Sequence, residues 1–165
     1  MNSDKDLAEA SNFYDAKYLE FVDNVLKESA DSFEREGKFT DNTLLNLFNI
    51  FGGSFERGLE LYEQGCVTYI FPYDTGNTGV FRNKDVTRYL IQVKGHSESL
   101  YTLFPEINYC TCPSFRSQVL NDKLQFTCKH VIAAWLSVIT KDKISYQYIT
   151  KKQFQSVLQY QALHK

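Results

Sequence analysis

The chain has 165 residues and a mass of 19.2 kDa, enough for one compact domain or one domain with a small appendage. Hydrophobic residues make up 43% and charged residues 23% of the sequence, which excludes collagen-like, low-complexity and wholly disordered chains. The formal net charge is only -2. A histone-like protein or a polybasic membrane anchor is therefore excluded as well.

The sequence contains no apolar run typical of a secretory signal or a membrane span. Its first fifteen residues are polar and acidic, and the apolar run Val131 to Leu136 is far shorter than the roughly 20 residues that a spanning helix needs. We therefore expect a soluble intracellular protein that does not associate with a membrane. Its four cysteines would then stay reduced and need a role other than disulfide bonding.

The N-terminal third of the chain predicts helices. Apolar residues recur at helical spacing between Phe13 and Glu36, which indicates an amphipathic helix. A second helix is expected from Asp41 to Phe51, with Thr40 or Asp41 as its N-cap and a glycine pair after its last residue. A third helix is expected from Phe55 to Gln64.

The middle of the chain predicts strands. Cys66 to Phe71 is strand-like and precedes a turn-rich stretch over residues 72–79. The runs Val86 to Val93 and Leu100 to Phe104 flank a turn at residues 94–98, so we expect them to pair as a hairpin. The segment Ile107 to Cys112 would continue the extended chain.

Two more helices are predicted toward the C-terminus. The first covers Lys129 to Thr140, and the second covers Lys151 to Leu163, with Thr150 and Gln153 as a capping box. Helices, then strands, then helices indicate an α+β fold with a small antiparallel sheet. We expect an N-terminal helical region over residues 1–65, a hairpin and metal-binding finger over 66–140 and a helical tail over 141–165, packed as one compact unit.

Four potential metal ligands lie in one segment, as a CxC pair followed after a loop by CxH. Side chains two residues apart face the same side of an extended chain, so Cys110 and Cys112 can bind one ion from the end of a strand. Cys128 and His130 can share that ion if Cys128 precedes the next helix and His130 lies in its first turn. The helix predicted to begin at residue 129 meets that condition.

Three thiolates and one imidazole form a donor set typical of tetrahedral zinc. Because the protein supplies all four ligands, no coordination position remains for an activated water, and we expect a structural Zn²⁺ site. The loaded site would carry one net negative charge, for which Lys129 or Arg116 could be the counter-charge. Two alternatives stay open: buried free thiols in an ordinary core, and a redox pair formed by Cys110 and Cys112.

The remaining cysteine and histidines are not expected to bind metal. Cys66 is predicted to be a small core residue, and His96 and His164 are predicted to be solvated. Ala133 follows His130 by one helical turn, where a small side chain would let the CxC segment approach closely. Helix propensity alone explains an alanine at this position equally well.

The pattern CxC, a variable loop and CxHxxA resembles the SWIM zinc-binding domain. The chain also resembles, more narrowly, the small SWIM-domain subunit of the Shu complex, a family also called SWIM-domain-containing protein seven. This resemblance is carried by four segments: Tyr109 to Phe115, Val119-Leu120, Cys128 to His130, and Trp135-Leu136. By matched positions, the resemblance implies one motif alanine, Ala133, and four zinc ligands: Cys110, Cys112, Cys128 and His130.

The resemblance also implies a role in homologous recombination. Members of this family bind one or more RecA-like recombinase paralogues and promote recombinase filaments on single-stranded DNA. We therefore expect a nuclear, non-catalytic zinc-binding adaptor in DNA repair, with single-stranded DNA as a further ligand within the complex. The candidates for partner contact are the helix Phe13 to Glu36 and the aromatic residues Tyr146, Tyr148 and Phe154, although ordinary packing of terminal helices would also account for them.

Direct DNA binding and catalysis are the two alternative classes of function. SWIM domains also occur as direct DNA-binding modules in transposase-like or chromatin-associated proteins, and a group of lysines near the C-terminus could contact phosphate: Lys141, Lys143, Lys151, Lys152 and Lys165. The near-balanced net charge argues against strong DNA binding by the isolated chain. An enzyme is disfavoured because the sequence has no Walker motif and the predicted metal site has no open position.

Overall fold

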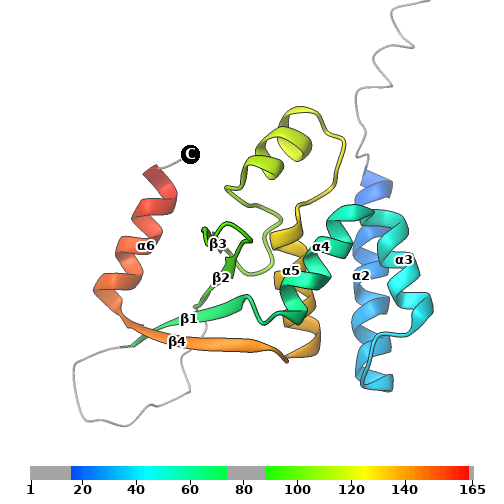
Figure 1. The fold of residues 1–165 in the computed structure, drawn as a ribbon, viewed down its shortest axis with the longest axis horizontal. Helices are drawn as coiled ribbons and strands as arrows, with labels where there is room; N and C mark the ends of the chain where they lie inside the picture. The colour runs from blue at the N-terminus through cyan, green and yellow to red at the C-terminus, as the bar shows by residue number, and fades with distance from the viewer. Residues whose placement is uncertain (1–15, 74–87, 164–165) are drawn as a thin grey trace, which may run out of the picture. The chain divides into compact units, whose positions relative to one another are not determined.

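The computed structural model describes residues 16–73 and 88–163 (Figure 1). They belong to two compact units, Met1–Gly52 and Gly53–Lys165. Four expectations lie outside the described residues: the helix start at Phe13, the turns and strand start over residues 74–87, the solvated His164, and Lys165 as a contact to phosphate. No helix in the described part of the chain combines the length and the apolar character that crossing a membrane requires.

The first unit contains two helices, α2 (Ala16–Glu36) and α3 (Asp41–Phe51). The bounds of α3 are those predicted, because both of its ends are set locally. Thr40 is the N-cap and its side-chain oxygen accepts the amide N–H of Thr43 at 3.2 Å, while Gly52 ends the helix with a φ of 53°. The hydroxyl of Thr43 also lies 3.4 Å from that of Ser32 on α2.

The second unit is built on a four-stranded sheet with the order β3-β2-β1-β4. Its strands are β1 (Val67–Tyr73), β2 (Leu90–Lys94), β3 (Leu100–Leu103) and β4 (Ile144–Thr150). β2 pairs antiparallel with β1 and with β3, as the predicted hairpin requires, whereas β4 pairs parallel with β1. The α+β class is confirmed, but the sheet is mixed rather than antiparallel. A helix-containing connection precedes β4, and such crossovers are what parallel pairing needs.

Helices α5 (Lys129–Thr140) and α6 (Lys151–Leu163) pack on opposite faces of this sheet. Consecutive residues of β1 point to opposite faces: the Tyr69 hydroxyl lies 3.3 Å from Ser137 Oγ on α5, whereas Ile70 packs in a cluster with Phe154 on α6. Phe154 is only 8% exposed, so this candidate for partner contact is a core residue instead.

The predicted capping box opens α6. Gln153 donates its amide N–H to Thr150 Oγ1 at 3.2 Å, and the Gln153 side-chain oxygen accepts the Thr150 amide N–H at 2.9 Å. These reciprocal bonds satisfy two amide groups that the first turn of a helix leaves without partners.

Helix α4 (Gly53–Glu63) lies against α5 at an unusually short distance. A Cβ atom on Gly58 would lie only 2.6 Å from Ile132 Cγ2 and 3.0 Å from the carbonyl oxygen of Lys129. This contact explains why α4 belongs to the second compact unit, which begins at Gly53.

The chain between β3 and α5 differs from expectation. The predicted extension of the strand over residues 107–112 does not form, and a π-helix, η1 (Phe115–Asn121), follows instead. The amide N–H of Cys112 donates to Cys110 Sγ at 3.4 Å, and that of Phe115 donates to Cys112 Sγ at 3.3 Å. The backbone therefore folds around the sulfur atoms and does not pair with a strand.

Candidate metal centre

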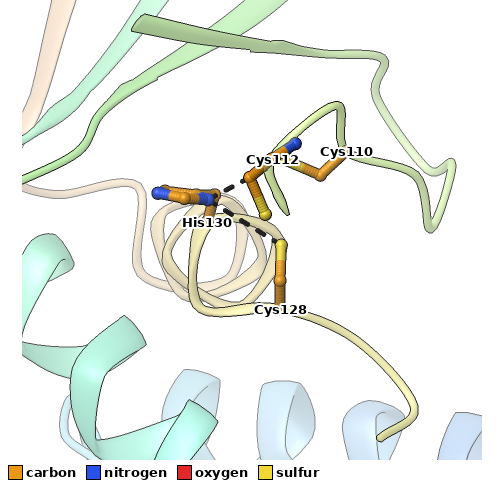
Figure 2. Close-up of side chains that lie close together, drawn as sticks. All are labelled: Cys110, Cys112, Cys128 and His130. Carbon is orange, nitrogen blue, oxygen red and sulfur yellow. Dashed lines mark hydrogen bonds between the residues drawn. The ribbon is translucent and has the colours of Figure 1, made fainter. Parts of the chain in front are cut away.

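The structure brings the four predicted ligand residues together, as Figure 2 shows. Cys110, Cys112, Cys128 and His130 each offer one ligand atom, and these atoms all lie within 4.8 Å of one another. His130 Nδ1 is 3.8 Å from Cys110 Sγ and 3.9 Å from Cys128 Sγ. No ligand residue is more than 3% exposed.

The two halves of the site come from different kinds of local structure. Cys110 and Cys112 lie in the loop that follows β3, and the amide–sulfur bonds described above hold this loop in shape. Cys128 is the N-cap of α5, with an extended backbone at φ -107° and ψ 165°, and His130 is the second residue of that helix. This junction, which allows two residues in a CxH pattern to face one point, is the one expected from the spacing.

Two of the distances between ligand atoms, those from His130 Nδ1 to Cys110 Sγ and to Cys128 Sγ, are close to the values expected around zinc. Zn–S bonds of about 2.3 Å and Zn–N bonds of about 2.0 Å at tetrahedral angles separate sulfur from nitrogen by about 3.5 Å and sulfur from sulfur by about 3.8 Å. The two sulfur–nitrogen distances exceed this value by only a few tenths of an ångström. The site is therefore a buried Cys3His group positioned to bind a metal ion, and its donor set suits Zn²⁺.

The thiols interact strongly with one another. A hydrogen bond from the Cys110 thiol, together with one from Cys128, holds the pKa of Cys112 far below its usual range. The same bond to Cys112 raises the pKa of Cys110, and burial adds to this effect. The metal-free cluster thus keeps protons on Cys110 and Cys128, whose pKa values are raised, and metal binding must release them.

Two cations stand beside the cluster. Arg57 and Lys129 line a cavity of about 70 Å³ that also reaches Cys128, so both can offset the negative charge of a loaded Cys3His site. Lys129 was expected in this role, whereas Arg57 on α4 was not, because nothing in the linear order of residues connects it to the cysteines. Arg116, the other expected counter-charge, is exposed on η1.

The residues that were not expected to bind metal lie apart from the cluster. Cys66 is half-buried just before β1 and belongs to no ligand group among the described residues. His96 is exposed in the β2–β3 turn, where its Nδ1 lies 3.2 Å from Lys129 Nζ. Ala133 is fully buried on α5, and its predicted role in letting the CxC segment approach stays a prediction.

Sequence reasoning missed the residues on the far side of the His130 ring. The ring of Tyr101, on β3, stacks on the imidazole with 4.1 Å between the ring centroids. Gly95, directly after β2, also approaches the imidazole: a Cβ atom on it would lie 3.3 Å from His130 Nε2. Neither residue belongs to the CxC…CxH pattern, and only the pairing of β2 with β3 brings them to the site.

Comparison with known proteins gives a consistent family assignment. The SWIM zinc finger family model matches residues 103–139. The human zinc finger SWIM domain-containing protein 7 is 29% identical over 120 residues, which cover 73% of this chain and 77% of the relative. The mouse protein of the same name is 30% identical over 123 residues, which cover 74% of this chain and 73% of the relative.

A more distant organism has a similar protein. The zinc finger SWIM domain-containing protein 7 homolog of Dictyostelium discoideum is 31% identical over 101 residues, which cover 61% of this chain and 57% of the relative. No solved structure matches the chain. The names of these relatives describe a zinc-finger domain and no enzymatic activity. With its buried Cys3His group inside the matched segment, the chain belongs to the family of zinc finger SWIM domain-containing protein 7.

Proposed function

We propose that the protein is a non-catalytic adaptor subunit of a Shu-type complex in the nucleus. In this role it binds a RecA-like recombinase paralogue and promotes the assembly of recombinase filaments during homologous recombination. The family assignment supports this proposal, because it agrees with the narrower resemblance carried by the residues around the CxC and CxH motifs.

The observation that supports a non-catalytic role is that the metal site is closed. Four protein side chains surround one point, and the most exposed of them is only 3% accessible. A catalytic zinc site keeps a coordination position for water or substrate, whereas a structural site fills all four positions with protein. Zinc bound here would hold the loop after β3 against the start of α5 and so stabilise the second unit.

The aromatic face of β1 and β4 is the surface that we assign to the partner. Tyr146 and Tyr148 on β4 are 59% and 53% exposed. Both rings stack near Phe71 on β1, with centroid distances of 6.3 and 5.6 Å. Exposed tyrosines on a regular strand suit a protein interface, because their large rings bury apolar area at a low entropic cost.

Co-purification of the full chain with a RecA-like paralogue tests the adaptor role. A Tyr146→Ala/Tyr148→Ala double variant should lose most of the bound partner while its zinc content stays unchanged. Tyr160→Ala provides the matched control, because Tyr160 is 58% exposed on α6, and it should bind the partner normally. An unmodified chain that binds zinc but captures no such paralogue, in cells or when co-expressed, would contradict the adaptor role.

One observation favours direct DNA binding as a second candidate. Two exposed lysine pairs flank β4, Lys141 and Lys143 before it and Lys151 and Lys152 after it. A strand with exposed aromatic rings between cationic groups resembles the platforms that bind single-stranded nucleic acid.

Titration of a labelled single-stranded oligonucleotide separates the two functions. If the isolated chain binds DNA directly, affinity should fall steeply with salt, and Lys151→Gln/Lys152→Gln should reduce the slope of log K against log salt by about 2. Salt-insensitive or absent binding, together with tight capture of a recombinase paralogue, supports the adaptor alone.

A further inference from the structure

We infer that the β2–β3 hairpin, through Gly95 and Tyr101, positions the imidazole of His130 for metal binding. Both residues precede the segment 103–139 that the SWIM family model matches, so they supply support from outside the motif. The inference concerns the metal centre and does not depend on the proposed adaptor role.

The first observation is the stacking of Tyr101 on His130. The two rings are 4.1 Å apart at their centroids and inclined by 28°. A ring held in this way can slide or tilt only by losing the contact, and the stack therefore sets the plane of the imidazole. In that plane Nδ1 points toward the sulfur atoms of Cys110 and Cys128.

The second observation is the space that Gly95 leaves. A Cβ atom on Gly95 would lie 3.0 Å from Tyr101 Cε2 and 3.3 Å from His130 Nε2. The φ of Gly95 is outside the left-handed region, so an L-residue could adopt this backbone and the requirement for glycine is one of space. A side chain here would push the imidazole toward the sulfur atoms or separate it from Tyr101.

The third observation is the burial of His130 Nε2 without a hydrogen-bond partner. A neutral imidazole has one N–H group and one free lone pair. When a histidine binds a metal through one ring nitrogen, its other ring nitrogen usually donates a hydrogen bond to a carboxylate, a carbonyl or water. Here the described residues provide no such acceptor, and the orientation of the ring depends on the stack and the close glycine instead.

Backbone hydrogen bonds keep these two residues in place. Gly95 donates its amide N–H to the carbonyl oxygen of Ser99 at 2.8 Å, and Glu98 donates to the carbonyl oxygen of Gly95 at 3.1 Å. Tyr101 lies opposite Val93 in the β2–β3 pairing. The turn thus presents Gly95 and Tyr101 together, on a frame that does not itself contain a metal ligand.

The test measures Zn²⁺ affinity of the full chain by competition with a chromophoric chelator at fixed pH. Tyr101→Ala and Gly95→Ala should each weaken binding by about ten- to hundredfold, the usual loss when support of a metal ligand is removed. Tyr101→Phe keeps the ring and should bind Zn²⁺ within about twofold of the unmodified chain.

A destabilised hairpin could also lower the affinity, so the readout must report on the ring itself. Leu90→Ala is the matched control, because Leu90 is buried on β2 but packs in the cluster with Ile70 and Phe154. The ¹⁵N shifts of His130 in the Zn²⁺-loaded chain, and the d–d absorption of the Co²⁺-loaded chain, should change in Tyr101→Ala and stay unchanged in Leu90→Ala.

The inference is overturned if Tyr101→Ala keeps the ¹⁵N and Co²⁺ spectra of the unmodified chain and loses no more Zn²⁺ affinity than Leu90→Ala does. If Tyr101→Ala does not fold even with excess Zn²⁺, the same criteria apply to Tyr101→Leu, which keeps an apolar side chain on the strand but lacks the ring.

Discussion

Replacing Gly58 by alanine tests how closely helix α4 must approach α5. The added Cβ atom would lie 2.6 Å from Ile132 Cγ2, 2.7 Å from Ile132 Cβ and 3.0 Å from the carbonyl oxygen of Lys129. Carbon atoms in contact ordinarily lie 3.5 to 4.0 Å apart. Ile132 is buried and the Lys129 oxygen belongs to the backbone, so rotation of a side chain cannot relieve the overlap.

Two opposing effects set the size of the change in stability. Alanine is better than glycine inside a helix by about 1 kcal/mol, whereas forcing extra volume into a packed core costs about 1 to 3 kcal/mol. An overlap of roughly an ångström belongs at the upper end of that range. Gly58→Ala should therefore lower the free energy of unfolding by about 2 kcal/mol, and it should also weaken zinc binding because Lys129 lies between Cys128 and His130.

Urea unfolding of the zinc-loaded chain measures this effect, with zinc content determined on the same samples. Gly53→Ala is the control, since the nearest atoms to its Cβ would be 3.9 and 4.0 Å away and it should be as stable as the unmodified chain. If Gly58→Ala unfolds at the same or a higher urea concentration than the unmodified chain, the close approach of α4 to α5 has no energetic importance and the reasoning fails.

Four further changes have defined outcomes. Cys112→Ser replaces a thiolate ligand by a hydroxyl, and the purified chain should contain far less zinc by elemental analysis and show reduced folding of the second unit by circular dichroism. Lowering the pH should release zinc, because protons compete with the metal for the sulfur atoms and for His130. A chelating dye should show that zinc release rises as the pH falls. Zinc release that does not depend on pH would contradict this expectation. Thr150→Ala removes the capping oxygen that faces Gln153 and should cost about 1 kcal/mol in urea unfolding, while Thr150→Ser should cost less. Ala133→Thr adds two heavy atoms to a side chain with no exposed surface; it should cost about 1 to 3 kcal/mol and lower zinc content, and unchanged values of both would leave helix propensity as the only role of Ala133.

Elements whose ends depend on neighbouring residues could be predicted closely from the sequence. The helix Lys129–Thr140 has its predicted bounds, because Cys128 is extended and the helical apolar pattern begins at once. The CxC and CxH pairs were predicted to meet for a similar reason: each pair needs only local geometry to face one point. The cluster that results matches the predicted set of four residues.

Features that arise from pairing between distant segments were missed. The segment Ile144–Thr150 was expected to belong to a helical tail, and its pairing as a strand parallel to Val67–Tyr73 depends on tertiary contacts. The extended conformation predicted for residues 107–112 competes with hydrogen bonds from backbone amides to the cysteine sulfur atoms, and those bonds prevail. Support of His130 by Tyr101 likewise has no signal in the linear sequence.

Helix α5 connects the metal centre to the surface proposed for the partner. Its first turn carries His130, and its last turn contacts the sheet through Ser137. The helix ends at Thr140, and the C-cap residue Lys141 has a φ of 54°. Lys141 and Lys143 both have a left-handed backbone conformation, and they turn the chain directly into β4, which presents the exposed aromatic rings. A metal ion that fixes the start of α5 therefore acts on the element that places β4 beside β1. On the proposed adaptor role, loss of the metal should therefore weaken partner binding as well.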